Sequence, residues 1–480
     1  MATSTTGPST DETPYLVPTD PSVHFVSLLS AGDAVDGATK ADGSPWRFVG
    51  TPDGIGAFDN HDGTATVLVN HEIGPTAGAE RAHGSAGAFV SALTVDWRTL
   101  EVVGAQDLGQ QFHLYDKAAG EWAQGTAALA RLCSADLAAP SAFYDEATGL
   151  GTQARILLNG EETGAEGRAL AWIASGAERG EVWELPALGR FSIENLLASP
   201  NSGERTVVIG NEDATGGQLY LYAGEKQAAG NDIEKAGLAD GHLYGIQADF
   251  LTEVAEGQRL EGAFKLANLG DVSPRTGAEL QDYSAAAGVT GWLRPEDGAW
   301  DTQNPDRYYF ATTDAIDAPS RLWALDFHDV KHPEWGGTYR ALLDGTEGQK
   351  MLDNVTVSAD GTVVALEDVG NNPRAGKVWD YDPKTDTLKE LAHHDTARFG
   401  DQTLPPTPPF NQDEESSGVL DVTELFPRDP GQKVFLIDTQ AHYPYGAAGS
   451  AERQEVVEGG QLMLMYVDGY APATGDQPFV

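Results

Sequence analysis

The stretch T-A-T-V-L-V-N-H-E at residues 64–72 sets the pattern of the chain: a short apolar strand that ends in acid or amide groups. Runs rich in β-branched residues, bounded by Gly, Asp and Asn turns, are typical of strands. The same unit occurs again at 154–162, 206–213, 307–314, 362–368 and 433–438. Each is followed by a second strand with an aromatic residue, in order Trp97, Trp172, Tyr220, Trp323, Trp379 and Tyr466. Because the repeated unit is a pair of strands, we expect an all-β chain.

Six repeats of this unit predict a six-bladed β-propeller. The 480 residues give 480/6 = 80 per blade, whereas a four-stranded blade needs only about 40–50 residues. The strands must therefore be separated by insertions, which usually gather on one face and build a site there. No domain boundary stands out, so residues 15–480 are expected to form a single β-propeller domain. Residues 1–14 are polar and predict a flexible N-terminal tail.

The acid groups at the strand ends suggest a metal site, provided that these strands are the innermost of their blades. Converging carboxylates need compensating charge, and oxygen ligands from several strands suit Ca²⁺. The alternative is that the acids only end strands and accept hydrogen bonds in turns. The group comprises Glu72, Glu161, Glu162, Glu212, Asp213, Asp314, Glu367, Asp368 and Asp438.

Charge is the strongest feature of the composition, because 30 Lys and Arg stand against 73 Asp and Glu, so 30 − 73 = −43. This balance argues against nucleic acid and against an anionic membrane as partners, since both require a basic face. The single Cys excludes an intrachain disulfide and a zinc site made of Cys alone. No apolar run approaches the roughly 18 residues of a spanning helix, and no signal peptide is visible.

Five dispersed segments together resemble the PhoX-type alkaline phosphatases. They are N-H-E (70–72), R-L-C-S (131–134), G-R-F-S-I-E-N (189–195), G-W-L-R-P-E-D (291–297) and D-N-V-T-V-S-A-D-G-T-V-V-A-L-E (353–367). The resemblance covers most of the chain and departs from the family at Ile193, where many members have His. It implies a six-bladed propeller with Fe³⁺ and Ca²⁺ clustered at the mouth of its channel.

The resemblance also implies roles for single residues. Cys133 would be an iron ligand, Glu296 a metal ligand, and Arg294 the catalytic residue that holds phosphate. From residue type alone, Cys133 in an apolar stretch could be a small buried hydrophobe, and Arg294 with Glu296 a surface ion pair. Asn70 and Asn354 are expected to bind substrate beside Arg294. Further expected metal ligands are Glu194, Glu212, Asp213, Glu72, Glu161, Glu162, Asp353 and Glu367.

The predicted function is hydrolysis of small phosphate monoesters at an iron and calcium cluster. The absence of a G-x-S-x-G elbow and a Walker A loop agrees with chemistry that needs no protein nucleophile. We expect a monomer that is secreted or periplasmic, as the family is. Two alternatives remain: a calcium-dependent propeller hydrolase of another class, such as a lactonase or a phytase-like enzyme, and a non-catalytic calcium-stabilised binding propeller. A phytase should show several basic residues for a polyphosphate, whereas only Arg294 is persuasive.

Overall fold

The computed structural model describes residues 3–40 and 42–469, and strands make up most of their regular structure. Contacts divide these residues into two compact units. Unit 1 comprises 3–40, 42–82, 86–107 and 353–469, and unit 2 comprises 83–85 and 108–352. The prediction of a single β-propeller domain over 15–480 stays a prediction.

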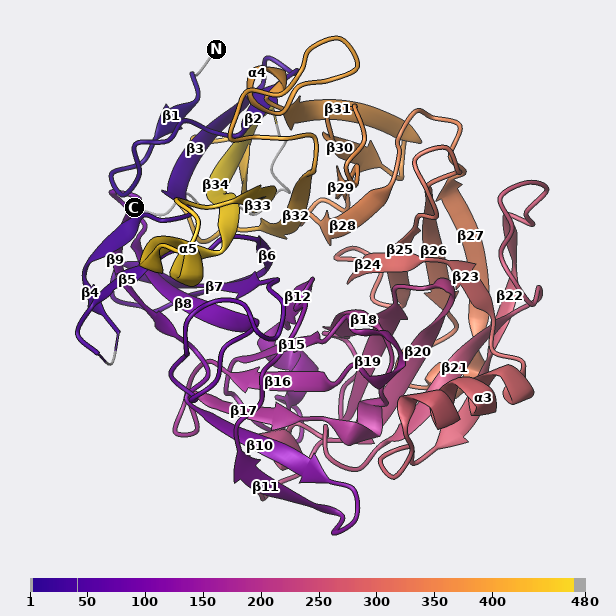
Figure 1. Ribbon diagram of the computed structural model, residues 1–480. Helices are drawn as coiled ribbons and strands as arrows, with labels where there is room; N and C mark the ends of the chain where they lie inside the picture. The colour runs from indigo at the N-terminus through magenta and orange to yellow at the C-terminus, as the bar shows by residue number, and fades with distance from the viewer. Residues whose placement is uncertain (1–2, 41, 470–480) are drawn as a thin grey trace. The chain divides into compact units, whose positions relative to one another are not determined.

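Unit 1 has three larger sheets among its described residues, antiparallel except for one parallel pair (Figure 1). The first follows chain order, with β6 (Pro52–Asp59), β7 (Thr64–His71), β8 (Phe89–Asp96) and β9 (Glu101–Asp107). The second joins early and late parts of the chain, in the order β1 (Thr5–Thr6), β3 (Val23–Ser30), β34 (Glu458–Asp468), β33 (Gln432–Pro444) and β32 (Glu414–Asp421). The third has the order β2 (Leu16–Pro18), β31 (Thr387–His394), β30 (Lys377–Asp382), β29 (Val363–Glu367) and β28 (Leu352–Val357). Smaller elements are β4 (Ala34–Thr39), β5 (Pro45–Arg47), α4 (Thr396–Phe399) and α5 (Ala451–Val456).

Unit 2 contains two large sheets (Figure 1). One has the order β11 (Glu121–Gly125), β10 (Gln111–Asp116), β17 (Glu181–Glu184), β16 (Ala169–Ile173), β15 (Ile156–Gly160) and β12 (Ala135–Leu137). The other has the order β18 (Ile193–Ala198), β19 (Arg205–Glu212), β20 (Thr215–Glu225), β21 (His242–Ala248), β22 (Glu261–Gly270), β27 (Gly337–Leu343), β26 (Arg321–Phe327), β25 (Arg307–Thr312) and β24 (Pro295–Trp300), with β23 (Gly291–Leu293) beside β20. Smaller elements are β13 (Tyr144–Asp145), β14 (Leu150–Gly151), α1 (Pro140–Phe143), α2 (Asp232–Lys235), α3 (Gly277–Ala287) and the short 3₁₀ helices η1 (Gly164–Glu166), η2 (Pro186–Leu188) and η3 (Pro333–Trp335).

Apolar alternation explains the cores of both units. In unit 1, Val67 and Val69 of β7 are fully buried in the same cluster as Leu436 of β33 and Leu464 of β34. In unit 2, aromatic residues dominate, and the rings of Trp292 and Trp323 lie 5.4 Å apart in an edge-to-face contact. Each fully buried side chain of this size contributes about 1.5–3 kcal/mol through removal of apolar surface from water.

All six predicted strands with acidic or amide ends are present, as β7, β15, β19, β25, β29 and β33. Their predicted place as innermost strands is wrong, because each lies second in its sheet with a paired strand on both sides. The neighbours that the sequence pattern missed are β6, β12, β18, β24, β28 and β32. A strand that is paired on both edges and buried on both faces needs a run of apolar residues. The search for apolar runs therefore found these strands and missed the more polar strands at the ends of the sheets.

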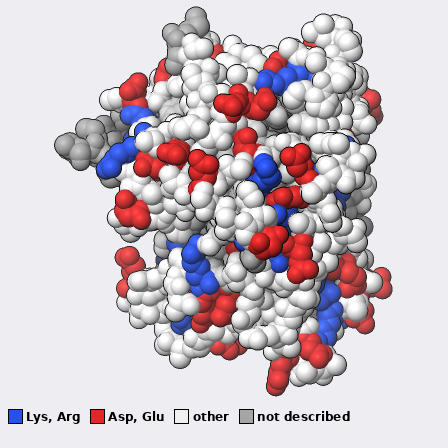
Figure 2. All heavy atoms as spheres, turned by 60° about the vertical axis from the view of Figure 1, so that its left-hand side comes forward, with Lys and Arg blue, Asp and Glu red and all other residues white. Residues whose placement is uncertain are grey.

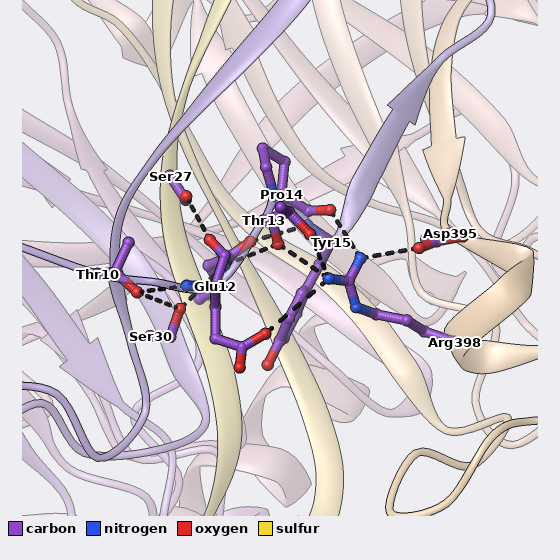
Figure 3. Close-up of polar contacts among 10 residues, drawn as sticks. Thr10, Glu12, Thr13, Pro14, Tyr15, Ser27, Ser30, Asp395 and Arg398 are labelled. Carbon is purple, nitrogen blue, oxygen red and sulfur yellow. Dashed lines mark hydrogen bonds and ion pairs between the residues drawn. The ribbon is translucent and has the colours of Figure 1, made fainter. Parts of the chain in front are cut away.

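Residues 3–14, predicted as part of a flexible tail, make ordered contacts within unit 1 (Figure 3). β1 pairs in parallel with β3, and β2 pairs with β31. Between them the Arg398 guanidinium donates through Nη1 to the carbonyl of Pro14 at 3.1 Å and through Nη2 to the hydroxyl of Thr13 at 2.5 Å. The segment from β1 to β2 therefore links two sheets of unit 1.

Acidic side chains are spread over the face shown in Figure 2, with fewer basic side chains among them. On this face the excess of acidic residues that gives the net charge of −43 is spread among many side chains. Among the described residues, no helix combines the length and the apolar character that crossing a membrane would require.

Candidate functional site

Cys133 lies in a loop of unit 2 that is bound to the chain just after β15. The backbone N–H of Glu162 donates to the carbonyl of Arg131 at 2.9 Å, and the N–H of Ala130 donates to the Glu161 carboxylate at 3.1 Å. The Cys133 thiol itself donates to Oε2 of Glu162 at 2.9 Å. Hydrogen bonds from both backbone and side chains therefore fix the sulfur beside a carboxylate.

Cys133, Glu162 and Glu194 form a compact donor group in unit 2, with one ligand atom of each within 4.8 Å of the others. An oxygen of Glu194 also lies within 4.8 Å of an oxygen of Glu296. Cys133, Glu194 and Glu296 are all buried, with only 7%, 4% and 2% of their surface exposed. Buried carboxylates this close repel one another unless a cation compensates them. A sulfur and carboxylate set fits iron, and the carboxylates alone fit calcium.

Glu194 and Glu296 both lie in β-bulges. Their strands, β18 and β24, are the two end strands of the larger sheet of unit 2. The pairing of β18 with β19 shifts register at Glu194. The pairing of β24 with β25 shifts register between Pro295 and Gly298. A bulge places two residues opposite one and changes the direction of a side chain. The same backbone device therefore lets two different strands contribute carboxylates to one group.

Arg294 connects this group to a further carboxylate. Its Nε and Nη2 donate to the two oxygens of Asp213, each at 2.7 Å, and its Nη2 lies 3.2 Å from Oε1 of Glu296. Its backbone is left-handed, with φ 53°, although it precedes Pro295. The residue before a proline is normally extended, and a left-handed non-glycine residue costs about 1–3 kcal/mol. The strain is held by the bidentate pair, which fixes the guanidinium next to Glu296.

Two predicted ligands of unit 2 are engaged in other contacts. Glu161 accepts two hydrogen bonds from Arg168, through Nε at 2.5 Å and Nη2 at 2.9 Å. Glu212 accepts from the backbone N–H of Gln218 at 3.0 Å and from the amide of Gln281. Burial raises the pKa of Glu212 to about 7. In both adjacent acid pairs the second residue meets the site: Glu162 belongs to the donor group, and Asp213 pairs with Arg294.

Five predicted site residues belong to unit 1. Glu367 is fully buried and accepts from the indole of Trp379 at 2.9 Å and from Arg374 at 3.0 Å. Glu72 accepts from the Gln440 amide at 2.9 Å. The other three are the buried Asn70 and Asn354 and the half-buried Asp353, and the substrate or metal roles of all five stay predictions.

The sequence analysis missed two features of the unit 2 site. Arg131 forms an ion pair with Oε2 of Glu162. The amide of Asn195 donates to Ser134 at 3.0 Å and to Asp297 at 2.6 Å, which ties the Cys133 loop to β18 and β24. The signal was present in part, since R-L-C-S and I-E-N were both recognised, but only Cys133 and Glu194 were selected from them.

No family model matches the chain, and no curated protein matches its sequence. Among solved structures, Pseudomonas fluorescens PhoX in complex with vanadate, a transition state analogue, is similar over 95% of this chain and 98% of that chain, with a TM-score of 0.66 and 12% identity. A putative 6-phosphogluconolactonase from Bacteroides uniformis aligns over 78% of this chain and 91% of its own, with a TM-score of 0.31 and 11% identity. A Trypanosoma rangeli sialidase aligns over 93% of this chain and 58% of its own, with a TM-score of 0.37 and 10% identity. The likeness to PhoX shows a shared, mostly β fold of the propeller kind.

Proposed function

We propose that this protein is a metal-dependent phosphomonoesterase built on a six-bladed propeller. The observation that carries the proposal is the guanidinium of Arg294 held beside Glu296, whose oxygen in turn lies within 4.8 Å of Glu194 in the sulfur and carboxylate group. The likeness in fold to a PhoX structure that holds vanadate supports the proposal, because vanadate is an oxyanion with the bonding geometry of phosphate. Export from the cytoplasm and a monomeric state are part of the proposal and rest on the resemblance alone.

The chain's own residues have separable tasks in this proposal. Cys133, Glu162, Glu194 and Glu296 would hold Fe³⁺ and Ca²⁺. When bound, the ions would supply Lewis acidity toward the phosphoryl oxygens and acidify a water molecule. Arg294 would bind non-bridging oxygens as negative charge shifts during phosphoryl transfer. Asp213 would orient the guanidinium, so that Arg294 offers a planar group and not only a point charge.

Local positive charge is required because the protein carries a net charge of −43. At physiological ionic strength, charges are screened beyond about 8 Å, so capture of a dianionic ester depends on the nearest groups. A guanidinium and bound cations reverse the sign of the potential at that distance. Substrate binding is therefore local and does not depend on long-range attraction.

Metal analysis combined with an assay tests the proposal. Protein purified without added metal should contain both iron and calcium, hydrolyse p-nitrophenyl phosphate and be inhibited by vanadate. Calcium without iron, together with lactone hydrolysis, would favour the calcium-dependent hydrolase. The absence of phosphomonoester hydrolysis with both metals supplied would overturn the phosphatase proposal.

A further inference from the structure

Arg131 is a second guanidinium at the donor group. Its Nη2 contacts Oε2 of Glu162, the same oxygen that accepts from the Cys133 thiol. Its carbonyl accepts from the Glu162 backbone N–H at 2.9 Å. Both the backbone and the side chain of Arg131 therefore bind one residue of the group that is proposed to hold metal.

Arg131 and Arg294 share an unusual conformation and differ in exposure. Both are left-handed, with φ 46° and 53°, a region that non-glycine residues seldom occupy. The Arg131 side chain is 53% exposed, whereas that of Arg294 is 30% exposed. Arg131 pairs with Glu162 and Arg294 with Glu296, and ligand atoms within 4.8 Å of each other link Glu162 to Glu194 and Glu194 to Glu296, so the two guanidinium groups bind different members of one set of carboxylates. Arg131 thus stands at the solvent side of the same group.

Occupation of the group by a cation would change the balance at Arg131. A cation bound to Glu162 would compensate the negative charge of its carboxylate, and the same oxygen would then bind the Arg131 guanidinium less strongly. The attraction between Arg131 and Glu162 would then weaken, and the guanidinium would exchange this contact for an anion of the ligand. An exposed arginine suits the part of an ester that extends toward solvent, and its planar fork matches carboxylate and phosphate oxygens.

We propose that Arg131 is a specificity-determining residue that binds an anionic group on the leaving-group side of the ester. The preferred substrates are phosphomonoesters that carry a second anionic group, such as a carboxylate or a second phosphate. This inference rests on the proposed phosphatase function. It assigns Arg294 to the phosphoryl group and Arg131 to the remainder of the molecule.

The test compares two substrates that differ in one group. 3-Phosphoglycerate carries a carboxylate where glycerol 3-phosphate carries a hydroxymethyl group. The wild type should show a higher kcat/KM for 3-phosphoglycerate, and Arg131→Ala should reduce the ratio of the two kcat/KM values by about tenfold or more, as expected for one lost charged hydrogen bond. Most of the change should lie in KM. Arg131→Lys should restore part of the ratio.

A binding measurement gives a readout that does not depend on turnover. Phosphonoacetate and ethylphosphonate differ by a carboxylate in place of a methyl group, and titration calorimetry on the metal-loaded protein gives the Kd of each. Arg131→Ala should weaken phosphonoacetate relative to ethylphosphonate by a similar factor. Iron and calcium contents of the variant are measured in parallel, so that metal loss is distinguished from anion loss.

Arg259→Ala is the matched control, because Arg259 is an exposed arginine of unit 2, 61% exposed, that pairs with Asp249 at 2.8 Å. It should leave both ratios as in the wild type. If the wild type hydrolyses glycerol 3-phosphate but Arg131→Ala keeps both wild-type ratios, the inference is overturned and the proposed function stands. If the wild type hydrolyses neither ester, the proposed function fails and the inference fails with it.

Discussion

Arg294 in unit 2 and Arg398 in unit 1 are both partly buried arginines with several partners, and the partners differ in kind. Arg398 donates to the carbonyls of Pro14 and Thr13 and pairs with Asp395 at 2.8 Å (Figure 3). Its guanidinium also lies 5.2 Å from the ring centre of Tyr15. Arg294 faces carboxylates, Asp213 and Glu296, from a strained backbone.

The difference distinguishes an arginine whose partners are mainly parts of the local structure from one whose partners are buried carboxylates, as the proposed ligand-binding role of Arg294 requires. Backbone carbonyls and aromatic rings are neutral, so most of the groups around Arg398 belong to local structure, and its close carboxylate partner is Asp395, three residues earlier. Arg294 stands among acids that repel each other, in a conformation that the fold must enforce. The free-energy cost of this backbone strain would then be offset by binding of an ion or substrate and not by folding.

The largest effect expected from this comparison follows Arg294→Ala. Turnover of p-nitrophenyl phosphate should fall by about two orders of magnitude or more, in line with the loss of one transition-state donor. Arg294→Lys should recover only part, because an ammonium lacks the bidentate geometry. The Ala variant also removes the guanidinium that pairs with Asp213, whose side chain is only 8% exposed. The melting temperature of the variant should therefore fall. Adding Asp213→Asn should restore melting but not turnover; restored turnover would contradict the role of Arg294.

Cys133→Ser tests whether the sulfur is a ligand or only packing. We expect iron content and any thiolate-to-iron absorption to fall by about tenfold or more, because a hydroxyl is a much weaker ligand for iron than a thiolate. The fold should survive, since the volume change is small and Glu162 can accept from the hydroxyl. Elemental analysis and visible spectra measure this directly. A variant with full iron, colour and activity would show that Cys133 is only a buried small side chain.

Glu212→Gln tests the different roles of two adjacent acids, Glu212 at the end of β19 and Asp213 just after it. Burial raises the pKa of Glu212 from 4.5 to about 7, so the folded state binds its proton more tightly than the unfolded state. The wild type is then penalised as pH rises from about 4.5 to 7, by up to about 3 kcal/mol. The Gln variant, which mimics the protonated acid, should gain relative to the wild type over that range. Denaturant unfolding at pH 5 and pH 8 measures the difference, and Glu225→Gln, at a side chain 68% exposed, should follow the wild type.

The sequence predicted the apolar strands and much of the donor group, but not the place of those strands. β19 was recognisable from T-V-V-I-G, whereas β18 and β24 carry Glu194, Glu296 and Asp297 at bulges and do not alternate regularly. The resemblance supplied Glu194 and Glu296 where periodicity could not. Strand alternation could not distinguish Glu162 from Glu161 or Asp213 from Glu212, because Glu161, Glu162 and Asp213 lie just beyond the ends of β15 and β19. Contacts that depend on loop conformation, such as Arg131 with Glu162, have no signal in a single sequence.

The smallest effect concerns Arg398, and it tests the other side of the comparison. Arg398→Ala should lower the free energy of unfolding by about 2 kcal/mol, because it removes charged hydrogen bonds to two carbonyls and to Asp395. Phosphatase activity per folded molecule should be retained. Arg428→Ala is a matched control, since Arg428 also lies in unit 1 and its side chain has the same 19% exposure. Among the ion pairs of the described residues, Arg428 pairs only with the exposed Glu424, four residues earlier. A helix-spaced exposed pair contributes about 0.5 kcal/mol or less, so the control should change stability little. Equal losses in the two variants would show that Arg398 is an ordinary surface residue and that its contacts with Thr13 and Pro14 do not hold the first strands in place.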